Sequence, residues 1–239
     1  MTLRVGHLYP DYLNIYADRG NIAVLTERAR LRGHELEVLP IGLETDVPAG
    51  IDLFYVGGGQ DREQALVSRD LAGKGEVLRA AVEAGSAFLA VCGGYQLLGS
   101  FYRGRDGAEL PGIGLLPLHT VAGERRMIGD VLLSCDWAVQ TLAGFENHAG
   151  RTYLDAGAEP LGRVLAGFGN DGESGFEGCR RGRVYGTYLH GPLLPRNPWF
   201  ADLLLGEAIG VELEPLADEL EAEAHAVSAE RARARGGRY

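Results

Sequence analysis

The chain has 239 residues, of which 46% are hydrophobic and 23% are charged, a composition ordinary for a globular protein. Its formal net charge of −10 argues against a nucleic-acid partner, because such partners require basic side chains that neutralise phosphates. No run of about 18 apolar residues occurs, and the N-terminus lacks the apolar core of a signal peptide. We therefore expect no membrane insertion and a cytoplasmic location.

The three cysteines, Cys92, Cys135 and Cys179, are widely spaced and odd in number, which does not indicate a disulfide framework. Neither they nor the six histidines show the spacing of a zinc site, so we expect no structural metal. Three of these histidines, His7, His34 and His225, are interpreted as surface or strand-edge residues.

Short apolar runs alternate with helical patterns along the first ninety residues, which is typical of a parallel sheet with crossover helices. We expect strands at 3–8, 35–39, 53–56 and 87–91, and helices at 21–32 and 74–83. The run 87–91 is continuously apolar, as in a central strand buried on both faces. The predicted fold class is α/β, with a mostly parallel central sheet flanked by helices.

Beyond residue 99 the pattern is richer in strands and glycines. We expect strands near 113–118, 129–134, 163–168 and 183–188, and helices at 198–209 and 218–235. The predicted organisation is one domain over 1–210, followed by a C-terminal helix and polar tail over 211–239. The locally basic end is interpreted as solvated or frayed; it carries Arg231, Arg233, Arg235 and Arg238.

Cys92 follows the predicted central strand directly, in the sequence Val-Cys-Gly-Gly-Tyr-Gln over 91–96. A nucleophile at a sharp strand-to-helix turn needs small neighbours, because its own backbone is strained and crowded. The turn would raise the sulfur at the carboxyl edge of the sheet and place it near a helix amino end, which favours thiolate. The Gly93 amide would then be placed to bind an oxyanion. Cys135 and Cys179 sit at no such turn and are interpreted as inert.

A cysteine nucleophile needs a base, and His190 ends the predicted strand 183–188 just before Gly191 and Pro192. His119 and His148 lie in glycine-bearing segments that we interpret as loops, and they remain weaker alternatives.

The run Gly57-Gly58-Gly59-Gln60 follows the predicted strand 53–56. It lacks the Lys-Ser/Thr of a phosphate-binding P-loop, so a second oxyanion donor from Gly58 or Gly59 fits better. A flexible turn without chemistry is the alternative.

Together these elements resemble class I (triad-type) glutamine amidotransferases of the cobyric acid synthase-like branch. The Gly-x-Cys-x-Gly-x-Gln elbow of that family matches residues 90–96, with Ala90 in place of the first glycine. The resemblance extends to about residue 210. It implies a flavodoxin-like fold and a glutaminase that releases ammonia from L-glutamine through Cys92 and His190.

Longer local matches resemble the GatD family, the glutaminase subunits of lipid II isoglutaminyl synthases. These matches cover 8–21, 57–61, 144–152 and 185–192. The resemblance implies a heterodimer with a Mur-ligase-like subunit (MurT), which would use ATP and Mg to amidate the D-glutamate α-carboxylate of lipid II. It implies no cofactor in this chain.

Two site residues depend on the resemblance. Arg126 matches the arginine that GatD-type subunits use near glutamine, and a guanidinium can grip an α-carboxylate bidentately. Most family members carry an acid two positions after the histidine, where this chain has Pro192. The family implies that an aspartate of the partner replaces that acid. Glu177 or another acid in cis, or a Cys–His dyad, remains open.

Three other functions remain possible at this stage. The acceptor could be a corrin or another carboxylate, the chain could be a cysteine hydrolase of the peptidase or DJ-1 kind, or it could be a non-enzymatic scaffold.

Overall fold

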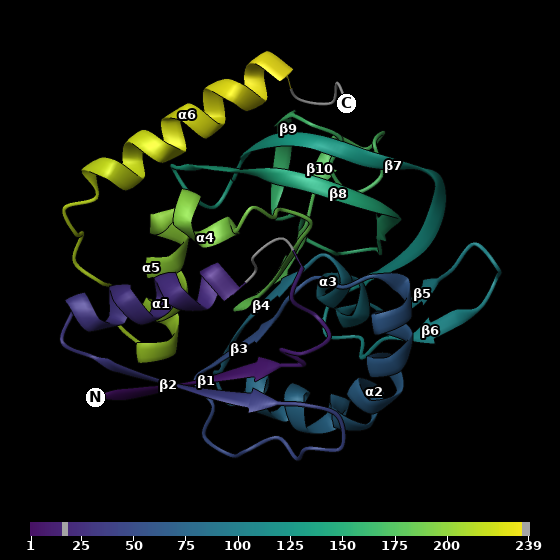
Figure 1. Cartoon of the computed structure of the whole chain (residues 1–239), viewed down its shortest axis with the longest axis horizontal. Helices are drawn as coiled ribbons and strands as arrows, with labels where there is room; N and C mark the ends of the chain where they lie inside the picture. The colour runs from purple at the N-terminus through teal and green to yellow at the C-terminus, as the bar shows by residue number, and fades with distance from the viewer. Residues whose placement is uncertain (16–18, 236–239) are drawn as a thin grey trace.

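The computed structural model describes residues 1–15 and 19–235, which are organised around two β-sheets (Figure 1). The first sheet has the order β11-β12-β4-β3-β1-β2. Its strands are β1 (Thr2–Leu8), β2 (Glu35–Ile41), β3 (Leu53–Val56), β4 (Ala87–Val91), β11 (Cys179–Arg181) and β12 (Val184–Thr187). All neighbours are parallel except β11 and β12. The predicted mostly parallel sheet is confirmed.

Helices cover both faces of this sheet. They are α1 (Arg19–Leu31), α2 (Asp61–Glu83), α3 (Gly93–Leu98), α4 (Leu193–Arg196) and α5 (Pro198–Ile209). In Figure 1, α1 and α5 lie on one side of the sheet and α2 lies on the other. Every residue of β3 and β4 is buried, as expected of central strands between helices.

Helix α2 begins thirteen residues before the predicted start at residue 74. Its interior contains Gly73 and Gly75, which lower helix propensity and obscured the pattern. A side chain at Gly75 would lie 3.3 Å from Ile113, so close packing accounts for one of these glycines. Asp61 and Glu63 in the first turn favour the helix start through its dipole.

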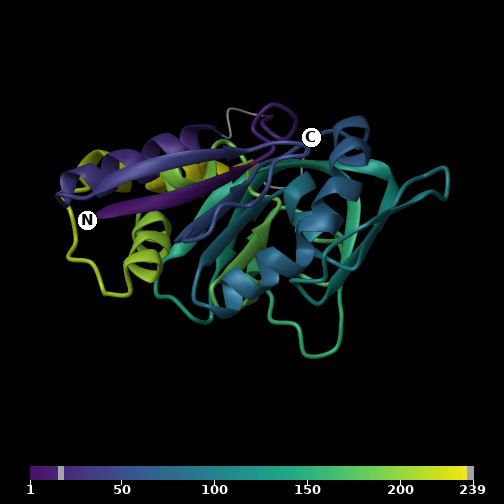
Figure 2. The ribbon, with the colours of Figure 1, turned by 90° about the horizontal axis from the view of Figure 1, so that it is seen from below.

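The second sheet contains β5 (Phe101–Arg103), β6 (Glu109–Pro111), β7 (Leu118–Ser134), β8 (Thr141–Leu154), β9 (Gly162–Ala166) and β10 (Phe176–Glu177). It is antiparallel except where β5 meets β7. Figure 2 shows the β5–β6 hairpin projecting from the body of the molecule. The strand predicted at 113–118 is wrong: Ile113 and Leu116 donate to carbonyls of Leu97 and Leu98, so they are tied to α3.

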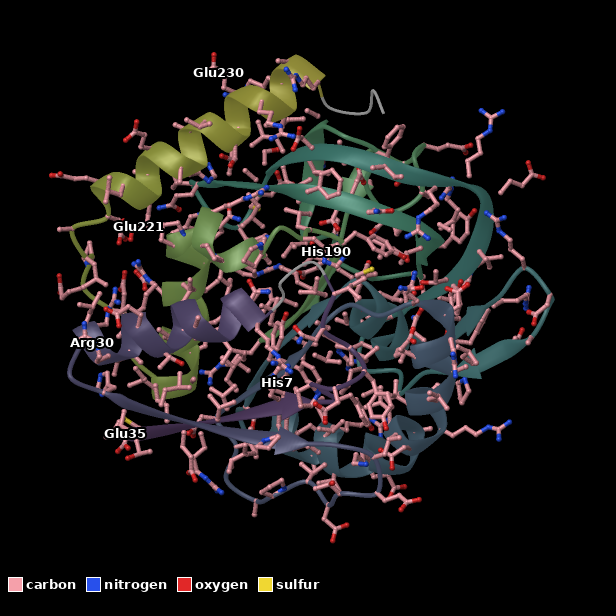
Figure 3. The ribbon with its side chains drawn as sticks, in the orientation of Figure 1. His7, Arg30, Glu35, His190, Glu221 and Glu230 are labelled. Atoms are coloured by element: carbon pink, nitrogen blue, oxygen red, sulfur yellow. The ribbon has the colours of Figure 1, made fainter. Side chains whose placement is uncertain are left out.

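The two sheets meet at His190. Its amide donates to the Phe145 carbonyl at 2.7 Å, and the Phe145 amide donates back at 3.1 Å, which joins the end of β12 to β8. Figure 3 accordingly places His190 near the middle of the molecule. The carboxyl edge of the parallel sheet is thus covered by the antiparallel one.

Helix α6 (Glu219–Arg235) lies across the second sheet (Figure 1). Ala229 and Ala232 are buried in a cluster with Leu132 and Ala143. Arg231 binds Asp130 at 2.8 Å, so this part of the predicted frayed end is packed helix. Arg238 lies outside the described residues. Within 1–15 and 19–235, no helix combines the length and the apolarity needed to cross a bilayer.

Candidate active site

Cys92 occupies the sharp turn between β4 and α3. Its φ of 51° and ψ of −107° form a backbone conformation that residues with side chains rarely adopt. The Cys92 amide donates to the Thr187 carbonyl at 2.8 Å, and the Gly94 amide donates to the Gly57 carbonyl at 3.1 Å. A side chain at Gly94 would lie 2.7 Å from Val56, so the turn requires glycine there. The strained turn therefore lies at the predicted sheet edge.

His190 lies beside Cys92 although the two are far apart in sequence. A Cβ atom placed on Gly58 would lie 2.7 Å from Cε1 of His190 and 3.2 Å from Cβ of Cys92. Those two atoms are therefore no further apart than the sum of these distances, which allows thiol and imidazole to meet. His190 is fully buried, whereas Cys92 is 5% exposed.

The Gly93 amide points away from helix α3. The Cys92 carbonyl accepts the Gln96 amide at 3.0 Å, and in a trans peptide the N–H points opposite to the C=O. The Gly59 nitrogen lies 3.0 Å from the position that a Gly93 Cβ would take. The structure thus brings the glycine loop after β3 against the turn at Cys92, as the sequence predicts.

A cavity of about 600 Å³ opens beside this turn, and Cys92 and Gly59 line it. Residues of the β7–β8 hairpin also line it, among them Arg126, Asn147 and His148. Arg126 donates from Nε to Asn147 Oδ1 at 2.8 Å and from Nη2 to the Asn147 carbonyl at 3.0 Å. One cavity therefore holds the thiol and a guanidinium whose orientation is fixed by β8.

A buried chain of polar side chains supports the turn. Gln64 Nε2 donates to the Gly93 carbonyl at 3.2 Å and to Gln96 Oε1 at 2.7 Å. Gln96 Nε2 donates to the Tyr188 hydroxyl at 3.0 Å, which lies 2.6 Å from the Thr152 hydroxyl. The network joins α2, α3, β8 and the segment before His190. Sequence reasoning missed Gln64, because the predicted helix began only at residue 74 whereas α2 begins at Asp61.

Glu177 is a fully buried carboxyl near the end of β12. It accepts the Tyr188 amide at 2.6 Å and the Thr187 hydroxyl at 3.0 and 3.1 Å. Burial raises the pKa of Glu177 to about 8, and these hydrogen bonds only partly oppose the shift. Its hydrogen bonds fix the two residues that precede Leu189 and His190.

The raised pKa of Glu177 predicts a pH-dependent stability. Because folding raises this pKa from 4.5 to about 8, the folded chain keeps a proton that unfolding releases. As the pH rises from 4.5 to about 8, the free energy of unfolding should fall by up to about 1.4 kcal/mol per pH unit, and above this range it should level off. Glu177→Gln mimics the neutral acid and should flatten this slope, as measured by urea unfolding at several pH values. The exposed Glu173→Gln is the control; equal slopes in both variants would contradict the assignment.

Several histidine predictions are wrong. His119 and His148 lie on β7 and β8 instead of in loops, and His7 is a buried residue of β1, which pairs on both sides. His148 stacks on Tyr188 with ring centroids 3.5 Å apart and donates from Nδ1 to the Gly150 carbonyl at 2.8 Å. Burial lowers the pKa of His148, and this side chain lines the cavity.

The two other thiols differ from Cys92 in their surroundings. Burial raises the pKa of Cys135 and of Cys179 to about 12, and neither lines the cavity beside the turn. Both are free thiols. These surroundings disfavour the thiolate form and fit the prediction that they are inert. Among the described residues, no group of His, Cys, Asp and Glu side chains is arranged to hold a metal ion.

The profile of the CobB/CobQ-like glutamine amidotransferase domain matches residues 4–198, which span both sheets and the turn at Cys92. The chain belongs to this family. The glutamine amidotransferase is 43% identical to the Staphylococcus aureus (strain N315) subunit GatD of lipid II isoglutaminyl synthase (glutamine-hydrolyzing), over 94% of this chain and 93% of that subunit. It is 37% identical to the Streptococcus pneumoniae subunit of the same name, over 87% of this chain and 80% of that subunit.

This glutamine amidotransferase also matches a cobyric acid synthase, but over a smaller part of that enzyme's length. It is 34% identical to the cobyric acid synthase of Synechococcus over 70% of this chain but only 34% of that enzyme.

A crystal structure of a glutamine amidotransferase superposes with a TM-score of 0.59 at 21% identity, covering 87% of this chain and 99% of that one. The glutaminase domain of Trypanosoma brucei CTPS gives a TM-score of 0.55 at 12% identity, covering 89% and 96%. These two likenesses concern the fold.

Proposed function

We propose that the chain is the glutamine-hydrolysing subunit of a lipid II isoglutaminyl synthase, with residues 1–210 as its catalytic domain. The observation that carries this proposal is coverage: the chain matches 93% and 80% of two GatD subunits but about a third of a cobyric acid synthase. The chain is therefore similar to nearly all of a GatD subunit but to only part of a corrin-amidating enzyme.

The reaction begins when the Cys92 thiolate attacks the side-chain carboxamide of L-glutamine. A carbon–sulfur bond forms and the carbonyl oxygen becomes an oxyanion. The Gly93 amide and a glycine amide of the 57–59 loop bind this oxyanion, and each donor stabilises the transition state by roughly 3 kcal/mol. His190 takes the thiol proton and gives it to the departing ammonia. It then deprotonates water, which attacks the γ-glutamyl thioester and releases glutamate and the free thiol.

The imidazole of His190 requires an orienting group for these proton transfers. Pro192 stands where most members of the family carry an acid. The likeness to GatD subunits supports an aspartate of the partner subunit in the orienting role, which would couple glutamine hydrolysis to complex formation. Comparing glutamate release by the isolated chain and by the complex tests this assignment. Full activity of the isolated chain would reject it.

Ammonia then passes to the partner, a Mur-ligase-like subunit in which ATP and Mg activate the D-glutamate α-carboxylate of lipid II. The test is co-expression with that partner, followed by amidation of lipid II in the presence of glutamine and ATP. Amidation of a corrin carboxylate instead, with lipid II unchanged, would reject the acceptor.

Arg126 is assigned to the α-carboxylate of glutamine, because its guanidinium lines the same cavity as Cys92. Arg126→Lys keeps the charge but loses the planar fork, so KM for glutamine should rise about tenfold or more while kcat changes less. The exposed Arg103→Lys, whose guanidinium pairs with Glu109, is the matched control. Steady-state glutamate release by the complex gives both constants. An unchanged KM in Arg126→Lys would refute the assignment.

A further inference from the structure

A loop near the N-terminus holds the peptide between Gly58 and Gly59 through a backbone hydrogen bond. The Ile15 amide donates to the Gly58 carbonyl at 3.2 Å. This peptide is trans, so the Gly59 N–H points away from Ile15. The Gly59 nitrogen also lies 3.0 Å from the position of a Gly93 Cβ, on the wall that Cys92 shares. The Ile15 hydrogen bond thus sets the direction in which the Gly59 amide points.

The loop 9–15 is itself firmly anchored. Tyr9 adopts φ 52°, donates its amide to the Ile41 carbonyl at 2.8 Å and donates its hydroxyl to Asp70 at 2.6 Å. The Tyr9 carbonyl accepts the amides of Tyr12 at 3.0 Å and Leu13 at 2.8 Å. The loop is therefore fixed to β2 and α2 by groups other than those of the candidate site.

Leu13 fills the space next to Gly59. Its side chain is fully buried, and a Cβ atom on Gly59 would overlap its Cδ2 atom. The next nearest atoms to that Cβ, the Tyr12 carbonyl oxygen at 3.4 Å and Glu63 Cβ at 3.6 Å, are at ordinary contact distance. Among the residues that the structure describes, Leu13 is thus the neighbour that a side chain at position 59 would displace.

We propose that the loop 9–15 positions the second oxyanion donor, and that this donor is the Gly59 amide. Ile15 holds the Gly58 carbonyl and so aims the Gly59 N–H at the substrate oxygen, while Leu13 keeps the peptide from moving back. Ile15 and Leu13 are positioning residues, because neither reacts with substrate. The proposal rests on the proposed glutaminase activity and assigns a role to the Leu13 and Ile15 positions of the opening motif.

The first test compares Ile15→Pro, which lacks the amide hydrogen, with Ile15→Val, which keeps it. In complex with the partner, Ile15→Pro should show kcat/KM for glutamine about 100-fold below that of Ile15→Val, the usual cost of one oxyanion donor. Its affinity for the aldehyde analogue of glutamine, which forms a tetrahedral thiohemiacetal, should fall in parallel. Alkylation of Cys92 by iodoacetamide needs no oxyanion site and should differ less than threefold between the variants. Equal kcat/KM in the two variants would overturn the proposal. So would an alkylation rate that falls in Ile15→Pro as far as its kcat/KM does.

The second test does not depend on proline. Gly59→Ala should lower kcat/KM about tenfold or more, because the new methyl group displaces Leu13 and the peptide. Adding Leu13→Ala removes the overlap and should recover most of that loss. A double variant no better than Gly59→Ala, or a fully active Gly59→Ala, would refute the role of Leu13 even if Ile15→Pro fails to fold. Failure of the wild-type complex to hydrolyse glutamine would instead reject the proposed function.

Discussion

Replacing Cys92 by alanine is expected to lower glutamine hydrolysis by about 10⁴-fold or more, because no other group can form the thioester. Cys92 alone among the three thiols combines a strained turn, the cavity wall and a neighbouring imidazole. Glutamate release by the complex with the partner subunit is the measurement. A residual rate well above background would place the nucleophile elsewhere.

Ammonium salts separate a lost nucleophile from a damaged complex. Free ammonia bypasses glutamine, so the Cys92→Ala complex should amidate lipid II from ammonium at the wild-type rate while failing with glutamine. Cys179→Ser is the matched control, because its buried thiol lies away from the cavity. It should retain glutamine-dependent activity. A Cys92→Ala complex that is inactive with both nitrogen sources would show that the substitution damages more than the nucleophile.

Gly58→Ala is expected to have the second largest effect. Its methyl group would lie 2.7 Å from His190 Cε1, 3.0 Å from Ile15 Cγ1 and 3.2 Å from Cys92 Cβ. Both reacting side chains stand at the ends of packed strands and cannot move aside without disturbing the turn. A misplacement of about 1 Å costs roughly 100-fold, so kcat/KM for glutamine should fall at least that far.

Gly73→Ala is the control for Gly58→Ala, because both add one methyl group. Gly73 lies within α2, and among the described residues nothing beyond the helix's own backbone lies within 4 Å of an added Cβ atom. Alanine there should therefore leave activity unchanged. It should also raise the free energy of unfolding by about 0.5–1 kcal/mol. A Gly58→Ala enzyme with the activity of Gly73→Ala would mean that the thiol and imidazole do not meet across Gly58.

The central part of the fold was predictable because its signals are local. Strand β4 is a five-residue apolar run, and Cys92 follows it immediately with two glycines. Strand β12 ends at Thr187, and His190 follows after Tyr188 and Leu189. Since parallel strands end at one edge, these two positions had to be neighbours once β4 and β12 paired, and they are paired directly.

The second sheet was harder to predict because its signals are not local. Strand β8 contains His148, which was interpreted as a loop residue because its segment is rich in glycine. Its neighbour Glu146 is buried because partners from a distant segment satisfy its carboxyl group, which accepts the amides of Phe168 and Gly169 at 2.6 and 3.0 Å. The sequence alone does not predict such partners, and it likewise does not predict the hydrogen bonds of Gln64.

The account depends on a reactive thiol that recognises glutamine, and covalent labelling with a diazoketone analogue of glutamine tests this most directly. With the partner present, we expect one label per chain, located on Cys92 by peptide mass spectrometry. Glutamine should protect against it, and His190→Ala should slow it. Labelling of Cys135 or Cys179 at a comparable rate, or labelling of Cys92 that glutamine does not slow, would contradict the account.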